Sequence, residues 1–496
     1  MAKKGKQRSG AAAVVEKLTG AEAYRPLLGA EEFEQLLKAL EEPLPAALRI
    51  NALKISAADA LATWPEWYGW EIRPVLFCPA GWQLLHDPER RPSLTPEYKL
   101  GFFFLQDAAS MLPAELFTWD EVEQPLILDL AAAPGGKSTH LASLSGDRGL
   151  LLANDNSYSR IAALKSVLQD WGAFNALVTN LPGEKIGGWL PEQFDRVLLD
   201  APCSMDNLRL AGKHARRPVS ARERQGLAQR QVQLLASAIQ AAKPGGQIVY
   251  STCTLAPEED EGVLDSVLRM LPGIVEIEEV QGLPIPAPAL SAAGGREFSP
   301  QVRRGLRLWP HLYGTSGFFA ARLRKLGSTG ARGDPRPYRP FEKQGLTRLG
   351  KSGQGAFLGR FAEQYGLDLG AVIEDHALTL WKRSEAIVAI PEAYLARFAD
   401  LPVEMAGLLV GEETRDGLAP SHELVARLGR RFTRGKVRIA LAEVDRWLTG
   451  MDVEAEGEGI GKVLAVEDER GRLLGRGKLH QQGRLKNMLP RRLVVG

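Results

Sequence analysis

The chain has 496 residues, of which 62 are lysine or arginine and 60 are aspartate or glutamate, so its formal net charge is +2. This length allows about three domains. Hydrophobic residues make up 45% and charged residues 25%, which is typical of a globular protein and excludes fibrous and wholly disordered classes. There is no long apolar run, and the apolar stretch at 11–15 is too short for a signal-peptide core, so we expect neither a membrane span nor a secretory leader.

The three cysteines, Cys78, Cys203 and Cys253, are too few for a disulfide framework and lack metal-ligand spacing. We therefore expect a protein of the reducing cytoplasm that holds no metal. For Cys78 in particular we expect a structural role.

The near-zero net charge argues against a nucleic-acid partner, but the charges are unevenly distributed. Residues 301–350 hold eleven lysines and arginines against two acids, and residues 471–496 hold seven and no acid. Such segregation can create a basic face, although basic side chains spread over several faces would give the same counts. The stretch 325–355 contains ten glycines and prolines, which predicts an interdomain linker over 326–355.

Strands and helices alternate in the middle of the chain. Apolar runs typical of buried strands lie at 126–130, 149–155, 176–180, 196–202 and 247–253, and helical patterns lie at 138–144, 159–171 and 223–242. This alternation predicts a mostly parallel, doubly wound α/β sheet. Ligands of such sheets bind at the carboxyl ends of the strands.

A turn of small residues, AAAPGGK, follows the first of these strands. A nucleotide-phosphate loop is one interpretation, but that motif needs glycine where Ala131 stands, and Pro134 removes a backbone N–H donor. The other interpretation is an S-adenosylmethionine site, in which small residues admit the cofactor. Asp155, about twenty residues further on at the end of the second strand, would then bind its ribose hydroxyls. We favour this second interpretation.

Two of the cysteines follow predicted strands, in DAPCS (200–204) and STCTL (251–255). Small buried cysteines at strand ends are common, so one alone would indicate packing. A pair beside a methyl-donor site indicates chemistry, because carbon 5 of a pyrimidine becomes nucleophilic only after a thiolate adds to carbon 6. A carboxyl such as Asp200 can supply the proton or strong hydrogen bond that cytosine N3 then needs.

These segments resemble the signature blocks of the Nop/Sun-type RNA cytosine-5 methyltransferases. The similar blocks are LDLAAAPGGKSTHLA, FDRVLLDAPCS and KPGGQIVYSTCTLAPEEDE, flanked by ALRINALKIS, GFFFLQDAASMLP and RLWPHLYGTSGFFAARLRK in the same order. The resemblance covers most of residues 45–325. It implies a Rossmann-like S-adenosylmethionine-dependent enzyme that methylates carbon 5 of a cytosine in RNA.

The resemblance implies a role for each matching residue. Cys253 would be the nucleophile that bonds to carbon 6, Cys203 would assist release of the methylated RNA, and Asp200 would contact the base near N3. The residues expected to contact S-adenosylmethionine are Ala131, Ala132, Ala133, Pro134, Gly135, Gly136, Lys137, Asp155, Arg160 and Asp200.

The C-terminal third resembles the larger bacterial members of the family, which methylate 16S ribosomal RNA of the small subunit and end in a PUA-like RNA-binding module. We therefore expect an N-terminal α/β RNA-binding subdomain (1–120), a catalytic domain (121–325), the linker, and a C-terminal RNA-binding region (356–496) of α+β type. We expect a monomer whose partner is 16S rRNA or the small ribosomal subunit.

The chain departs from the family pattern in three places. Ala131 replaces a cysteine, Pro182 stands where an aspartate near the adenine is usual, and the run from Met205 to Asn207 replaces a glycine-rich loop, with Arg209 left to supply a positive charge. The departures at Pro182 and Met205 leave open a non-catalytic ribosome-assembly factor that keeps S-adenosylmethionine as a structural ligand. Within the enzyme class, transfer RNA is the alternative target.

Other motifs favour packing over function. We expect His140 and His311 to be satisfied by their surroundings and residues 102–104 to form a buried element. Trp64, Trp67 and Trp70 should share one face of a helix.

Overall fold

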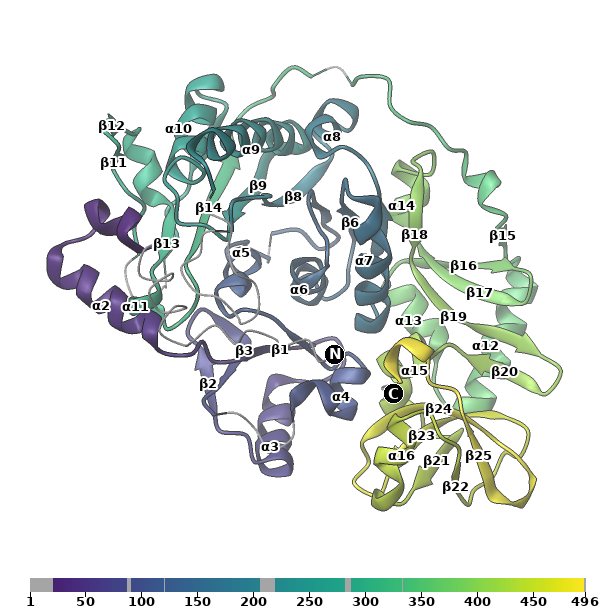
Figure 1. Cartoon of the computed structure of the whole chain (residues 1–496). Coiled ribbons are helices and arrows are strands. Elements are labelled where there is room, and N and C mark those ends of the chain that lie inside the picture. The colour runs from purple at the N-terminus through teal and green to yellow at the C-terminus, as the bar shows by residue number, and fades with distance from the viewer. Residues whose placement is uncertain are drawn as a thin grey trace, which may run out of the picture.

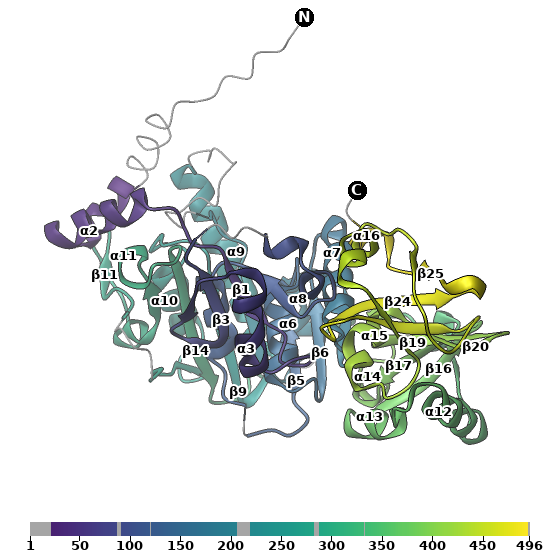
Figure 2. The same ribbon diagram turned by 90° about the horizontal axis from the view of Figure 1, so that it is seen from below.

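The computed structural model describes residues 21–86, 91–119, 121–205, 219–281, 287–331 and 333–494. A central α/β part lies between an N-terminal part, purple in Figure 1, and a C-terminal part, green to yellow. Figure 2, seen from below, shows the N-terminal part in front of the central part and the C-terminal part beside them. Within the described residues, no helix is both long and apolar enough to span a bilayer.

The central sheet has the strand order β10-β14-β9-β8-β5-β6-β7-β18, with β13 paired to β14. Its five middle strands run parallel, which confirms the predicted doubly wound sheet. These strands are β5 (Leu126–Asp129), β6 (Leu150–Asn154), β7 (Ala176–Thr179), β8 (Phe194–Asp200) and β9 (Ala242–Thr252). The helices around them are α5 (Leu112–Glu115), α6 (Gly136–Leu144), α7 (Tyr158–Trp171), α8 (Gly183–Trp189), α9 (Ala221–Ala241) and α10 (Glu261–Met270).

Antiparallel strands extend both edges of this sheet. On one side β14 (Phe318–Lys325) pairs with β9, and β10 (Val275–Ile277) and β13 (Leu306–Leu308) pair with β14. On the other side β18 (Val403–Ala406) pairs with β7, so a segment from the C-terminal third completes the central sheet. Shorter elements on the β14 side are β11 (Ala292–Ala293), β12 (Arg296–Glu297) and α11 (Pro310–Tyr313).

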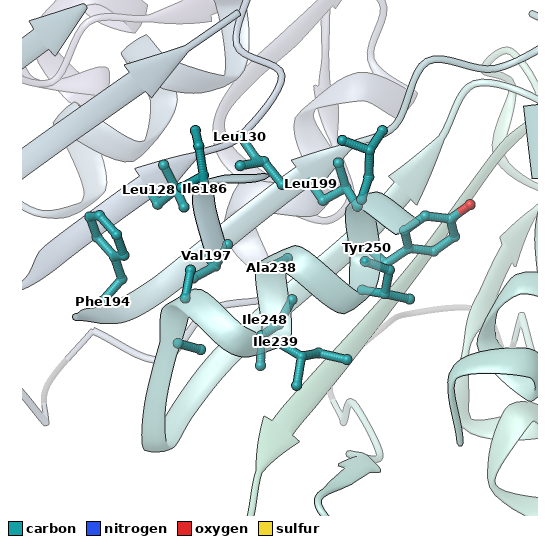
Figure 3. Close-up of a cluster of buried hydrophobic side chains, with 14 of the residues drawn as sticks. Leu128, Leu130, Ile186, Phe194, Val197, Leu199, Ala238, Ile239, Ile248 and Tyr250 are labelled. Atoms are coloured by element: carbon teal, nitrogen blue, oxygen red, sulfur yellow. The ribbon is translucent and has the colours of Figure 1, made fainter. Parts of the chain in front are cut away.

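Side chains alternate between the two faces of the parallel strands and build two apolar layers. Leu128, Val197 and Ile248 face α8, α9 and α10, where they pack against residues such as Ile186 and Ile239. Figure 3 shows this cluster between the strands and the helices. The alternate residues of the same strands pack against α5, α6 and α7. Burial on both faces explains why these strands are continuous apolar runs in the sequence.

The N-terminal part is a four-stranded antiparallel sheet with helices, as predicted for an α/β subdomain. The sheet has the order β2-β3-β1-β4. Its elements are α2 (Ala30–Glu41), β1 (Ala47–Ile50), α3 (Ala57–Tyr68), β2 (Ile72–Val75), β3 (Cys78–Leu84), α4 (Pro96–Lys99) and β4 (Phe103–Leu105).

The aromatic residues of the N-terminal part serve its core. The buried Phe103 confirms the expected buried element. The prediction of one tryptophan face was wrong for Trp70, because Gly69 ends α3 in the left-handed conformation and Trp70 lies beyond the helix. Trp70 is nevertheless buried, and its ring meets that of Phe103 edge to face.

Buried polar side chains join the N-terminal part to the central α/β part. The fully buried Arg49 of β1 donates to the carbonyl of Gly136, 2.9 Å away, and to Oγ1 of Thr139, 2.7 Å away. Asn51 donates to the carbonyl of Trp171 at the end of α7. Arg49 and Asn51, which both belong to the segment ALRINALKIS, therefore anchor the N-terminal part to α6 and α7.

The C-terminal third holds two five-stranded sheets. The first, in order, contains β15 (Thr347–Arg348), β16 (Leu378–Arg383), β17 (Ala386–Pro391), β19 (Leu408–Thr414) and β20 (Gly417–Pro420). The second contains β21 (Lys436–Ile439), β23 (Val463–Asp468), β24 (Leu473–Leu479), β25 (Arg484–Asn487) and β22 (Val453–Glu454). The helices are α12 (Lys351–Tyr365), α13 (Leu369–Asp375), α14 (Glu392–Arg397), α15 (His422–Leu428) and α16 (Val444–Leu448).

Two of these elements lie wholly or partly within the segment that was expected to be a linker. β15 and the start of α12 fall within the stretch 326–355, and β15 pairs with β16 of the C-terminal part. The PUA-like character of the last sheet stays a prediction.

The N-terminal and C-terminal parts also contact each other directly. Lys99 of α4 donates to the carbonyls of Leu448 and Leu493, at 2.9 and 2.8 Å. Arg472, the residue before β24, donates to the hydroxyl of Tyr68, 3.0 Å away. The three parts of the chain therefore pack against one another in a closed arrangement (Figure 1).

Candidate active site

The candidate residues follow four neighbouring parallel strands, β6, β5, β8 and β9. Asp155 follows β6, the AAAPGGK loop follows β5, Asp200 ends β8, and Cys253 follows β9. Because the carboxyl ends of parallel strands meet at one edge of a sheet, the fold gathers residues that are far apart in the sequence.

The loop after β5 is closely packed around its two glycines. Gly135 has φ +112°, and a Cβ atom there would lie 2.9 Å from Cγ1 of Val167 on α7. A Cβ atom on Gly136 would lie 2.9 Å from the ring of Phe104 in the N-terminal part. The loop is thus fixed between α7 and the N-terminal sheet.

The carboxylate of Asp155 closes one side of this loop. Its Oδ2 accepts a hydrogen bond from the backbone N–H of Ala133 at 3.0 Å, and its Oδ1 accepts one from the N–H of Ser157 at 2.9 Å. The Arg160 guanidinium lies 3.5 Å from Asp155 Oδ2 and donates to the carbonyl of Ala133. The fold therefore brings Ala133, Asp155 and Arg160 together, as a cofactor site requires.

Lys137 leaves the loop and pairs with Asp200. Its ammonium lies 2.7 Å from Asp200 Oδ2 and 5.5 Å from the centre of the Phe318 ring. Burial alone would lower the pKa of Lys137, but attraction to Asp200 outweighs it, so the pKa is raised. The hydroxyl of Ser251 donates to Asp200 Oδ1 at 2.8 Å. Lys137 was expected to contact the cofactor. Its charge instead lies beside Asp200, the carboxylate that was expected to contact the base.

The sulfur atoms of Cys203 and Cys253 lie 3.1 Å apart. A hydrogen bond from the Cys203 thiol lowers the pKa of Cys253, and the nearby Lys137 charge acts in the same direction. The same hydrogen bond, together with burial, raises the pKa of Cys203. Cys253 is therefore the sulfur that ionises first, as a nucleophile must.

Asp129, which the sequence analysis did not single out, lies at the end of β5 with no solvent exposure. Ser138 donates to its Oδ2 at 2.6 Å, and Oδ1 has no hydrogen-bond partner in the described part of the chain. Burial, reinforced by the charges of Asp200 and Asp155, raises the pKa of Asp129 to about 7. Its position before the small-residue turn was the signal that could have found it.

Cys78, Glu115 and His140 form a buried polar cluster behind the loop. His140 Nε2 lies 3.0 Å from a carboxylate oxygen of Glu115 and 3.9 Å from the Cys78 sulfur. Burial raises the pKa of Cys78 and lowers that of His140 to about 4, so the thiol is protonated and the imidazole neutral. Nε2 of His140 is satisfied within this cluster, but its buried Nδ1 has no hydrogen-bond partner among the described residues, so the expectation for His140 holds for only one of its ring nitrogens. The side chain of His311 lies 3.4 Å from Glu32, but neither of its ring nitrogens has a hydrogen-bond partner among the described residues, so the expectation that its surroundings satisfy it is not met.

The departures from the family pattern take defined positions where the structure describes them. Asn180 follows β7 and donates to the carbonyl of Asp155 at 2.7 Å, while Pro182 precedes the first residue of α8. Met205 is exposed and has φ +59°. Asn207 and Arg209 lie outside the described residues.

Many side chains of the two basic clusters are already engaged in ion pairs. Arg307 is fully buried against Asp260 and Glu261. The other basic residues of these segments that form ion pairs are Arg322, Arg324, Lys325, Arg336, Arg472, Lys478, Arg484 and Arg492. The residue counts therefore overstated the positive charge that these segments offer to a partner.

Comparisons with known proteins agree with this geometry. The family model described as 16S rRNA methyltransferase RsmB/F matches residues 117–324, and that of the N-terminal domain of 16S rRNA methyltransferase RsmF matches residues 21–108. Ribosomal RNA small subunit methyltransferase F of Vibrio atlanticus is 34% identical over 92% of this chain and 92% of its own length. The chain belongs to the RsmF family. The protein of the same name from Aeromonas hydrophila is also 34% identical, over 93% of both chains.

Solved structures support the RsmF assignment at the level of the catalytic fold. A methyltransferase homolog from Pyrococcus horikoshii is similar with a TM-score of 0.53 and 32% identity, over 63% of this chain and 99% of that one. NSun6 from the same organism has the same fold, with a TM-score of 0.52 and 23% identity over 62% of this chain and 98% of that one. An RsmF-family chain is an RNA methyltransferase, which rules out the nucleotide-phosphate interpretation of the loop.

Proposed function

We propose that this protein methylates carbon 5 of a cytosine in ribosomal RNA, with S-adenosylmethionine as methyl donor and Cys253 as covalent nucleophile. The observation that carries the proposal is the 3.1 Å contact between the Cys203 and Cys253 sulfurs, beside the Lys137–Asp200 pair. A methyltransferase acting on a nucleophilic atom needs no thiol, whereas pyrimidine carbon 5 does.

The residues around the loop fit S-adenosylmethionine. The loop from Ala131 to Gly136 carries only small side chains, and Asp155 lies beside it with oxygens that can accept from ribose hydroxyls. Arg160 steadies Asp155. When bound, the cofactor supplies an electrophilic methyl group on a sulfonium.

The chain's own side chains would activate the cytosine. The Cys253 thiolate adds to carbon 6, and the electron pair displaced from the carbon 5–carbon 6 double bond makes carbon 5 nucleophilic. As the thiolate adds, N3 of the ring takes up a proton from water, which it loses again when the aromatic ring re-forms. The Asp200 carboxylate, held by Lys137 and Ser251, would accept a hydrogen bond from this N3–H group. A flipped, single-stranded base can reach such a site at the strand ends.

The thiol of Cys203 would promote release. Once carbon 5 carries the methyl group, its remaining proton passes to water, the double bond re-forms and the bond from carbon 6 to Cys253 breaks. A thiolate leaves more readily when a donor stabilises it, and the Cys203 S–H lies at that sulfur.

The names of the relatives support a ribosomal target, 16S rRNA of the small subunit, over transfer RNA. Ribosomal RNA is a cytoplasmic substrate in bacteria, in keeping with the expected location. The expected monomer and the RNA-binding roles of the N-terminal and C-terminal parts stay proposals.

The direct test is to incubate the protein and S-adenosylmethionine with total RNA from a strain that lacks it, and to map 5-methylcytosine. New 5-methylcytosine in 16S rRNA supports the proposal. Label in transfer RNA alone would favour the alternative target, and no label with folded protein would favour a non-catalytic assembly role.

A further inference from the structure

Glu259 is a buried carboxylate that links the two cysteine-bearing loops. It follows Cys253 in the chain and has no solvent exposure. Its Oε2 accepts a hydrogen bond from the backbone N–H of Ser204 at 2.9 Å. Because Ser204 follows Cys203 directly, a side chain from beyond β9 holds the peptide group next to the cysteine that follows β8.

The other side of Cys203 is held through the same carboxylate. Gln231 of α9 is fully buried and donates to Glu259 Oε2 at 2.9 Å and to the carbonyl of Pro202 at 2.9 Å. The peptide groups before and after Cys203 are therefore both fixed by one network centred on Glu259. Arg224, also on α9, lies 3.8 Å from Glu259 Oε1 and balances its charge.

A second hydrogen bond links the loop that contains Cys203 to the loop that contains Cys253. The hydroxyl of Ser204 donates to Oγ1 of the buried Thr254 at 3.1 Å. Cys203 and Cys253 are thus each followed by a residue that bonds to the other loop. The next residue, Met205, is exposed with a positive φ.

We propose that Glu259 is a positioning residue for the release half of the reaction: it holds the Cys203 backbone so that the thiol stays in contact with the Cys253 sulfur as that sulfur leaves carbon 6. The inference rests on the proposed function. It differs from a purely structural role because Glu259 acts on Cys203, so its loss delays breakage of the adduct more than its formation.

The test follows the lifetime of the covalent complex. The full-length protein is incubated with small-subunit rRNA and methyl-labelled S-adenosylmethionine, chased with unlabelled cofactor and denatured at intervals, and label retained on protein is counted. The variants are Glu259→Ala, Glu259→Gln and Cys203→Ala/Glu259→Ala, with Cys203→Ala for reference. Glu184→Ala is the matched control. Glu184 of α8 pairs at 2.7 Å with Arg230 of α9, the helix that also carries Gln231, and within the described residues it contacts neither cysteine loop.

For Glu259→Ala we expect adduct breakage to slow about tenfold or more, because the buried Ser204 N–H loses its acceptor. In Glu259→Gln the rate of adduct breakage should stay within about threefold of wild type. The Ser204 N–H and the Gln231 amide both donate to one oxygen of Glu259, and glutamine retains that oxygen. The double variant should release no more slowly than Cys203→Ala alone, because both changes remove one function. Glu184→Ala should match wild type.

Wild-type release by folded Glu259→Ala, or equal slowing of adduct formation and release, would overturn the inference. So would additive slowing in the double variant. If Glu259→Ala does not fold, Gln231→Met replaces it, with slowed release again expected and unchanged release contradicting us. If wild type forms neither adduct nor 5-methylcytosine on any RNA, the proposed function itself fails, a result that no Glu259 variant can mimic.

Discussion

The Lys137 ammonium lies 2.7 Å from Asp200 Oδ2 and so connects the loop after β5 with the end of β8. The same cation lowers the pKa of Cys253. In the proposed mechanism, Lys137 therefore acts on both the carboxylate that would face the base and the sulfur that would attack it.

Replacing Lys137 by methionine should impair chemistry more than binding. The variant leaves Asp200 without its ion-pair partner and raises the pKa of Cys253, so we expect kcat to fall about 100-fold or more while RNA affinity changes little. Single-turnover methylation and an RNA-binding titration measure the two effects. Lys185→Met, which changes an exposed lysine on α8, is the control. A loss confined to RNA affinity would show that Lys137 only binds phosphate.

The contact between the sulfurs predicts a specific pH effect. In Cys203→Ala the Cys253 thiolate loses its hydrogen-bond donor, so its pKa rises and less thiolate exists at neutral pH. Alkylation of Cys253 by iodoacetamide should therefore be slower at about pH 7, and the pH range in which the alkylation rate increases should shift to higher pH. Peptide mass spectrometry follows the modified cysteine. An unchanged pH range would mean that Cys203 does not set the pKa of Cys253.

Asp155→Ala should weaken the cofactor site selectively. It removes a carboxylate that accepts from Ala133 and Ser157 at the loop. Hydrogen bonds to a charged group contribute about 1.5–3 kcal/mol, so the Kd for S-adenosylmethionine should rise by roughly 10- to 150-fold. Isothermal titration calorimetry gives this constant, and RNA binding should be retained. Unaltered cofactor affinity would show that Asp155 does not bind the ribose of S-adenosylmethionine.

Asp129 predicts a dependence of stability on pH. Its pKa is about 7 in the folded protein, whereas an unfolded aspartate ionises near pH 4, so the folded state binds more protons between these values. Stability therefore falls as pH rises through this window, and the penalty is complete above about pH 7. Asp129→Asn removes the titration, so the melting temperature of the variant relative to wild type should increase from about pH 5 to about pH 8. A pH-independent difference would contradict the raised pKa.

The central sheet could be predicted from the sequence because strands buried on both faces read as continuous apolar runs. β5 and β8 emerged where the runs LILDL and RVLLD lie. The edge strands could not be predicted in the same way. β18 finds its partner β7 more than two hundred residues earlier, a pairing that no local pattern encodes.

The two cysteines could be identified because their chemistry requires thiols at two strand ends. The partner of Lys137 could not be predicted, since a lysine after a glycine loop suits a phosphate as well as a carboxylate. Glu259 gave no signal within its acidic run, because only the fold shows that it is buried against Ser204. Charge counts misled for a similar reason: Arg307 adds to a basic cluster in the sequence but is buried in an ion pair.

In the proposed mechanism, Cys253 must form a covalent bond to the RNA. The most direct measurement is to digest the covalent complex of Cys203→Ala with ribonuclease and protease and to sequence the cross-linked peptide by mass spectrometry. We predict a methylated cytidine nucleotide on the peptide that contains Cys253, and no complex with Cys203→Ala/Cys253→Ala. A nucleotide on another residue, or 5-methylcytosine still formed by Cys253→Ala, would contradict the account.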